Sequence, residues 1–152
     1  MMAKDNRLKL RAVAAEDIEV LSALLQDGLV AASDLHYQKS QDNFMMVINR
    51  FCWEQGDDSG LERQLNRCLC GLKVGHVKQV SKCGMSAGAN QFYNLLSIAY
   101  EEAKENKEEL SRLTFTFSNG HGIRLAVDRI ALILQDIAPP HPGFARPQHS
   151  KS

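Results

Sequence analysis

The sequence has no excess of either charge and no long apolar run, and each absence excludes a class of protein. Eighteen Lys and Arg residues balance 18 Asp and Glu residues, so the formal net charge at pH 7 is zero. A broad nucleic-acid interface needs clustered excess Lys and Arg, so we expect no nucleic-acid partner. No apolar segment approaches the roughly 20 residues that span a bilayer, and the charged N-terminus is unlike a secretory signal. We therefore expect a cytoplasmic protein with no membrane partner.

Common catalytic signatures are also absent from the sequence. It contains no Gly-x-Ser-x-Gly nucleophile elbow, no phosphate-binding glycine loop and no Cys-x-x-Cys redox motif. These absences favour a protein that is not an enzyme, and we predict no cofactor.

The main candidate for a metal site is the run RCLCGLKVGHVKQVSKC, which contains Cys68, Cys70, His76 and Cys83. Zinc is usually held by two close pairs of ligands, and this spacing does not provide the second pair. If residues 68–76 form one strand, Cys68, Cys70 and His76 share a face with aliphatic side chains, and Cys83 does not. Reduced cysteine behaves as a small hydrophobic residue, so we predict a core strand without metal. Zinc binding by this run remains the less favoured alternative.

The clearest single element is a helix within residues 14–28. Ile18, Leu21 and Leu25 fall on one helical stripe, and acidic residues occupy the first turn, where the helix dipole favours negative charge. Gly28 follows where a left-handed residue commonly ends a helix. We predict an amphipathic helix that packs through this stripe.

Most of the remaining sequence has β patterns. They cover residues 8–13, 34–38, 43–53, 62–82, 92–101, 113–117, 123–128 and 130–134. Gly71 and Gly75 are expected to be bulges or bends. The phase of the alternation shifts at Asp128–Arg129, where we expect a bulge or corner.

These elements predict an α+β fold. The N-terminal helix would pack on a curved, mainly antiparallel sheet, or on a partly open barrel, of about seven strands. We expect residues 1–138 to form a single globular domain and residues 139–152 to form a Pro-rich, flexible tail.

The run NRFCWE offers the best candidate binding residues. Arg50, Trp53 and Glu54 combine a cation, an indole and a carboxylate at a predicted strand end, and Trp and Arg are enriched at interaction hot spots. We predict that they bind a protein partner or a small ligand at a face or rim of the sheet. The structural alternative places Trp53 in the core and pairs Arg50 with a carboxylate.

Two further hypotheses stay open from the sequence. Asp27, Asp136 and a histidine could form a non-local acid–base site if the fold brought them into one cleft. An uncovered edge strand could pair with a second copy to give a homodimer.

Several runs resemble a known family. They are LSALLQDGLVAASDL (21–35), NRFCWE (49–54), LLSIAYE (95–101), TFSNGHGIRLAVD (116–128) and LQDIAPPHP (134–142). Together they are similar to small proteins of unknown function that are found mainly in alphaproteobacteria. The resemblance implies no particular activity, substrate or site residue.

Overall fold

The computed structural model describes residues 7–52, 66–85, 91–104, 109–137 and 141–142. Within them, the regular structure comprises one α-helix, eleven strands and three short 3-10 helices (Ala32–Asp34, Lys39–Gln41 and Ser118–Gly120). In chain order the α-helix and the strands are β1 (Lys9–Ala12), α1 (Ala15–Leu25), β2 (Leu29–Ala31), β3 (His36–Gln38), β4 (Asn43–Phe51), β5 (Asn66–Val74), β6 (Val77–Cys83), β7 (Phe92–Glu101), β8 (Ser111–Phe117), β9 (Gly122–Val127), β10 (Leu132–Asp136) and β11 (His141–Pro142). Within these residues, no helix has the length and apolar character needed to cross a membrane.

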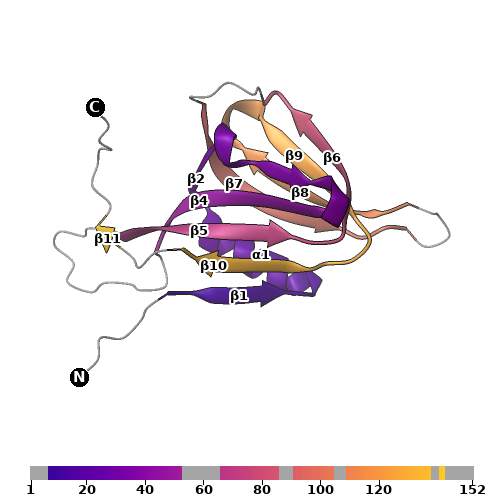
Figure 1. Cartoon of the computed structure of the whole chain (residues 1–152), viewed down its shortest axis with the longest axis horizontal. Helices are drawn as coiled ribbons and strands as arrows, with labels where there is room; N and C mark the ends of the chain where they lie inside the picture. The colour runs from indigo at the N-terminus through magenta and orange to yellow at the C-terminus, as the bar shows by residue number, and fades with distance from the viewer. Residues whose placement is uncertain (1–6, 53–65, 86–90, 105–108, 138–140, 143–152) are drawn as a thin grey trace.

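All strand pairs are antiparallel, and they join in the order β1-β10-β5-β4-β2-β7-β8-β9-β6, with β3 beside β4 and β11 beside β5. The sheet is strongly curved, so that β7, β8, β9 and β6 bend over β4, β5 and β10 (Figure 1). The predicted α+β class and antiparallel sheet are confirmed. The predicted number of about seven strands is wrong. Three-residue β2 and two-residue β11 are too short to show an alternation, and the predicted range 62–82 divides into β5 and β6.

A corner carries the chain from one half of the sheet to the other. β5 continues into β6 through Gly75 and His76, while their partners β9 and β10 are joined through residues 128–131. Gly75 N donates to Ala131 O at 2.8 Å, which holds the two bends together. The corner expected at Asp128–Arg129 and the bend expected at Gly75 are therefore confirmed.

Gly71 does not form the bulge or bend that was expected. It lies in the regular ladder of β5, opposite Val47 of β4 and Gln135 of β10. The prediction is wrong because a glycine within a strand can also mark a close approach or an empty place on the surface.

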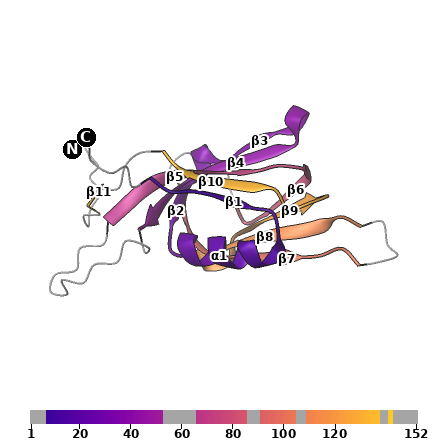
Figure 2. The ribbon, with the colours of Figure 1, turned by 90° about the horizontal axis from the view of Figure 1, so that it is seen from below.

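The helix packs on the inner face of the curved sheet, mainly against β7 and also against β1 and β4 (Figure 2). The predicted stripe of Ile18, Leu21 and Leu25 is buried, as expected. At the helix start, Asp17 Oδ2 accepts hydrogen bonds from the backbone N–H groups of Val13 and Ala14, at 2.9 and 3.1 Å. These bonds satisfy donors that have no partner within the helix.

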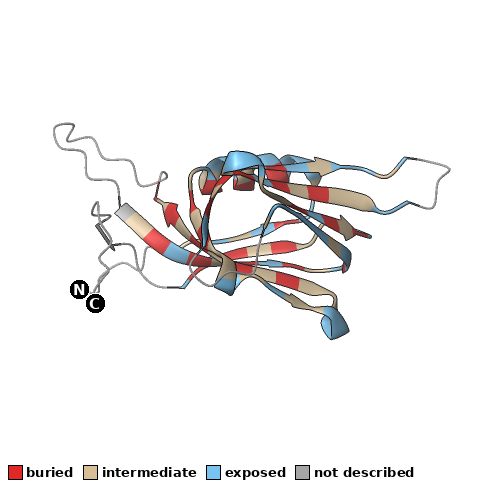
Figure 3. Ribbon diagram, turned by 90° about the horizontal axis from the view of Figure 1, so that it is seen from above, coloured by how far each residue is buried: buried red, intermediate tan, exposed pale blue. Residues whose placement is uncertain are grey.

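The core lies between α1 and the inner faces of the strands, and buried residues alternate with less buried ones along the sheet (Figure 3). Six residues of the predicted β8–β9 hairpin are buried as expected: Leu113, Phe115, Phe117, Ile123, Leu125 and Val127. Because the inner face is packed, an accessible site on this sheet has to lie on the outer face, at an edge or in the loops. Of the predicted tail, only His141–Pro142 is among the described residues, and it pairs with the beginning of β5.

The turn after the helix differs from the prediction. Asp27, not Gly28, has the left-handed backbone, with φ of 67°. Gln26 has φ −58° and ψ 135°, and Gly28 N donates to Leu25 O at 2.9 Å, which is the arrangement of a type II turn. Gly28 is required for a different reason, because a Cβ there would lie 2.6 Å from Ile48 Cγ2.

Replacing Gly28 with Ala is therefore expected to destabilise the protein by about 1–3 kcal/mol through overpacking. The matched variant Asp27→Gly removes a side chain from a left-handed residue and should change stability by less than about 1 kcal/mol. Urea unfolding of both variants tests the assignment. A larger loss for Asp27→Gly than for Gly28→Ala would contradict it.

Candidate ligand-binding groove on the outer face of the sheet

The outer face of β1, β10, β5 and β4 carries two rows of directly opposed residues. The first row is Arg11–Ile133–Lys73–Met45 and the second is Lys9–Gln135–Gly71–Val47. Successive residues of a strand point to opposite faces, and the even-numbered neighbours of these residues in β4, β5 and β10 are buried. The two rows therefore face outwards.

A groove of about 650 Å³ lies on this face where Gly71 has no side chain. Its partly exposed lining combines apolar and polar side chains. The apolar ones are Met45, Val47, Ile133 and Ile137, and the polar ones are Arg7, Asp34, His36, Lys73 and Gln135, of which Gln135 lies directly opposite Gly71. A Cβ on Gly71 would have Ile137 Cδ1 as its nearest neighbour, at 3.8 Å, so the floor has room for a larger residue. The volume falls within the roughly 300–1,000 Å³ that is typical of small-molecule sites.

A second hollow of about 340 Å³ adjoins the first. Both are lined by Lys73 and Ile133, and the second is also lined by Arg11. Lys73 therefore lies where the two hollows meet.

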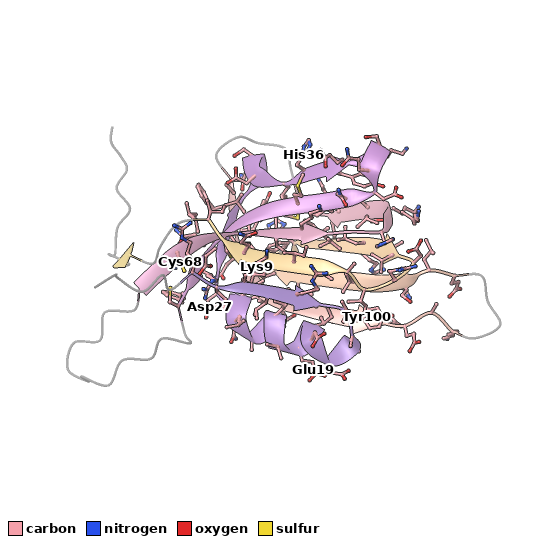
Figure 4. All side chains as sticks on the ribbon, turned by 60° about the horizontal axis from the view of Figure 1, so that its bottom comes forward. Lys9, Glu19, Asp27, His36, Cys68 and Tyr100 are labelled. Atoms are coloured by element: carbon pink, nitrogen blue, oxygen red, sulfur yellow. The ribbon has the colours of Figure 1, made fainter. Side chains whose placement is uncertain are left out.

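Positive charge is concentrated on this face although the whole chain is neutral. Lys9, Arg11 and Lys73 are exposed, and none of them takes part in an ion pair within the described residues. Figure 4 shows Lys9 on the sheet, whereas the acidic residue Glu19 lies on the helix. Cations on an edge strand such as β1 discourage pairing with another chain. That explanation does not apply to Lys73, because β5 lies between β10 and β4.

Arg50, the first of the predicted binding residues, lies on the inner face and is completely buried. Its Nε and Nη2 donate to Oδ1 and Oδ2 of Asp136 at 3.2 and 3.0 Å. Asp136 Oδ2 also accepts from Leu8 N at 2.8 Å, so the ion pair fixes the beginning of β1. Arg50 thus has the structural role of the alternative interpretation. Trp53 and Glu54 lie outside the described residues, and their binding role stays a prediction.

The two acids of the proposed acid–base site interact with different arginines. Asp136 binds Arg50 in the core, whereas the nearby charge of Asp27 acts on Arg67. Arg67 lies over the ring of Phe51, at 4.0 Å from its centroid. Burial lowers the pKa of Arg67, and Asp27 acts in the opposite direction. Asp136 is among the residues that line the groove, whereas Asp27 is not. The joint acid–base site of Asp27, Asp136 and a histidine stays a prediction.

The cysteine-rich run divides into β5, the corner and β6, and Cys68 and Cys70 of β5 face the core as predicted. Cys68 and Cys70 are buried, whereas Cys83 is exposed near the end of β6. His76 is not on the cysteine face, because β5 ends at Val74 and His76 has a left-handed backbone at the corner. Within the described ranges, no three His, Cys, Asp or Glu side chains gather closely enough to hold one metal ion.

The buried thiols are held in their protonated form. Burial raises the pKa of Cys70 to about 12. Burial also raises the pKa of Cys68, and its hydrogen bond with Cys52 adds to the effect. The two sulfur atoms of Cys52 and Cys68 are 2.9 Å apart. Because the thiolate is the nucleophile, Cys68 and Cys70 are poor candidates for nucleophilic catalysis at neutral pH.

The resemblance found in the sequence is confirmed by comparison with protein families. The family described as "Protein of unknown function (DUF2948)" matches residues 8–149. No curated protein and no solved structure matches the chain. Because the match spans nearly the whole sequence, the chain belongs to this family of proteins of unknown function.

Proposed function

We propose that the protein is a non-enzymatic cytoplasmic binding protein that holds a small amphipathic anion in the groove over Gly71. The observation that carries the proposal is the groove over Gly71, which has no side chain. Met45, Val47, Ile133 and Ile137 line this groove together with the exposed residue Lys73.

The lining favours a ligand with an apolar body. Met45, Val47, Ile133 and Ile137 border the groove, and Ile137 is 52% exposed. Covering such side chains is favourable by about 25 cal/mol for each Å² of apolar surface removed from water. An apolar group seated over Gly71 would touch these four side chains together.

The charges favour an acidic group at one end of that ligand. Lys73 borders both hollows, with Arg11 in the second hollow and Lys9 opposite Gln135. Asp34 is the one exposed carboxylate that lines the groove within the described residues, so cations outnumber it. A carboxylate, sulfonate or phosphate beside Lys73 would form a charge-assisted hydrogen bond. A nucleic acid would need a longer line of cations to follow its backbone.

The proposal is tested with 8-anilinonaphthalene-1-sulfonate, an amphipathic anion whose fluorescence rises in apolar surroundings. We expect saturable binding to the full chain and at least a tenfold loss of affinity in Gly71→Val, since the valine fills the floor. Lys73→Gln should weaken binding several-fold and reduce its dependence on salt. Fluorescence titrations at two salt concentrations measure both effects.

Matched controls distinguish a loss of dye binding at the groove from a loss caused by unfolding or by the change in net charge. Valine favours strands, and the Cβ contact at position 71 is ordinary, so Gly71→Val should unfold no earlier than the parent protein. Lys104→Gln removes an exposed cation away from the groove and should not alter binding. Equal dye binding by the parent protein and by Gly71→Val would refute the proposal. Native mass spectrometry that shows a dimer dissociated by Gly71→Val would refute it too, since a second copy would then be the occupant.

A further inference from the structure

Two thiols meet on the inner face, away from the groove. Cys68 lies in β5 opposite Arg50, and Cys52 follows directly after the last residue of β4. Their Sγ atoms are 2.9 Å apart, and both side chains are buried. A disulfide bond is about 2.05 Å long, so the sulfur atoms need to approach by less than about 1 Å. We propose that Cys52 and Cys68 are a modification site, a thiol pair that oxidises reversibly to a disulfide between β4 and the beginning of β5.

The other two cysteines have different neighbours, which makes the pairing specific. Cys70 Sγ donates to Ile48 O at 3.5 Å, and Cys83 Sγ lies 3.9 Å from Gly120 O on another part of the sheet. Cys83 is exposed and belongs to β6. No second pair of sulfur atoms is in contact within the described residues. One intramolecular bridge is therefore expected, and it leaves Cys70 and Cys83 reduced.

The chemistry requires an oxidant that accepts two electrons. In the test reaction two S–H bonds break and one S–S bond forms, while the azo bond of diamide takes up both hydrogens and becomes a hydrazine. A dithiol such as dithiothreitol reverses the reaction by thiol–disulfide exchange. Attack needs a thiolate, and burial opposes ionisation of Cys68. Oxidation should therefore be slower than alkylation of the exposed Cys83.

The position of the bridge predicts its effect on the protein. It would close the chain between residues 52 and 68 and tie the end of β4 to β5, beside the Arg50–Asp136 ion pair. A disulfide stabilises mainly by limiting the unfolded chain. The oxidised protein should therefore unfold at a higher urea concentration than the reduced protein. The reducing conditions of the cytoplasm would keep the thiol form, and an oxidant would convert it to the more stable bridged form.

The experiment treats the folded full chain with diamide at pH 8, removes the oxidant, and then counts thiols by alkylation in denaturant and intact mass. We expect two alkylated thiols instead of four, the loss of two hydrogen masses, and a cross-linked peptide that joins Cys52 to Cys68. Treatment of the oxidised protein with dithiothreitol should restore four alkylated thiols. Cys52→Ala and Cys68→Ala should each keep their remaining three thiols, whereas Cys83→Ser should still form the bridge.

A second condition distinguishes slow access of the oxidant to the buried thiols from a wrong choice of cysteine pair. The same treatment is repeated in urea just below the unfolding midpoint, where local opening is faster. Four thiols under both conditions would overturn the proposal. A bridge that maps to Cys70, or a dimer linked through Cys83 with no internal bridge, would overturn it as well.

Discussion

Asp136→Asn is expected to lower the free energy of unfolding by about 3–5 kcal/mol, because it would leave Arg50 charged in the core without a counter-charge. Both side chains are completely buried, and two hydrogen bonds join them. The carboxylate also accepts from Leu8 N, so the variant weakens the attachment of β1. A loss of this size is a large fraction of the 5–15 kcal/mol that stabilises a typical domain. Urea unfolding of the parent and variant proteins measures it.

Two controls assign the loss to the buried charge. Asp128 is exposed and lies near His76 and Lys78, so Asp128→Asn should cost less than about 1 kcal/mol. The double variant Arg50→Met with Asp136→Leu removes both charges and should be much more stable than Asp136→Asn alone. If Asp136→Asn costs no more than Asp128→Asn, the ion pair does not have the proposed role.

The elements that could be predicted are those whose two faces meet different surroundings. Phe115 and Leu125 alternate with polar residues, because one face of their hairpin is buried and the other is solvated. The same reasoning applies to α1, whose buried residues recur with the helical period. Such local patterns follow from burial and need no knowledge of the neighbouring strand.

The elements that could not be predicted depend on tertiary pairing. β2 has three residues, too few for an alternation, and it exists because Leu29 pairs with both Asn49 and Asn94. The turn at Asp27 and Gly28 is similar. A sequence shows that a glycine is present, but the contact with Ile48 that requires it appears only after the helix has packed.

The groove was missed for the same reason. Its rows combine residues from four strands, and Lys73 and Ile133 become neighbours only when the register of β5 and β10 is known. The one local signal was Gly71, a glycine within a strand pattern, which was interpreted as a bend. Arg50 was singled out correctly as unusual, but its partner Asp136 is 86 residues away in the sequence.

Alkaline pH is expected to destabilise the protein steeply, because Cys68 and Cys70 can release their protons only after unfolding. Burial raises the pKa of Cys70 from 9.0 to about 12, and it raises the pKa of Cys68 as well. Well below pH 9 both thiols are protonated in the folded and unfolded chain, so their contribution is constant. As the pH rises towards the folded pKa, the unfolded chain binds two fewer protons. Stability should then fall by roughly 3 kcal/mol per pH unit.

Urea unfolding at pH 8, 9 and 10 under reducing conditions measures this slope, and single cysteine variants identify its source. Cys70→Ala removes one buried thiol and should reduce the thiol contribution to the slope by about half, since one proton less is released on unfolding. Cys83 is exposed, so Cys83→Ser should leave the slope unchanged. Other groups that titrate in this range are common to all three proteins and cancel in the comparison. Equal slopes for the parent protein and Cys70→Ala would show that the buried thiols do not set the alkaline limit of the fold.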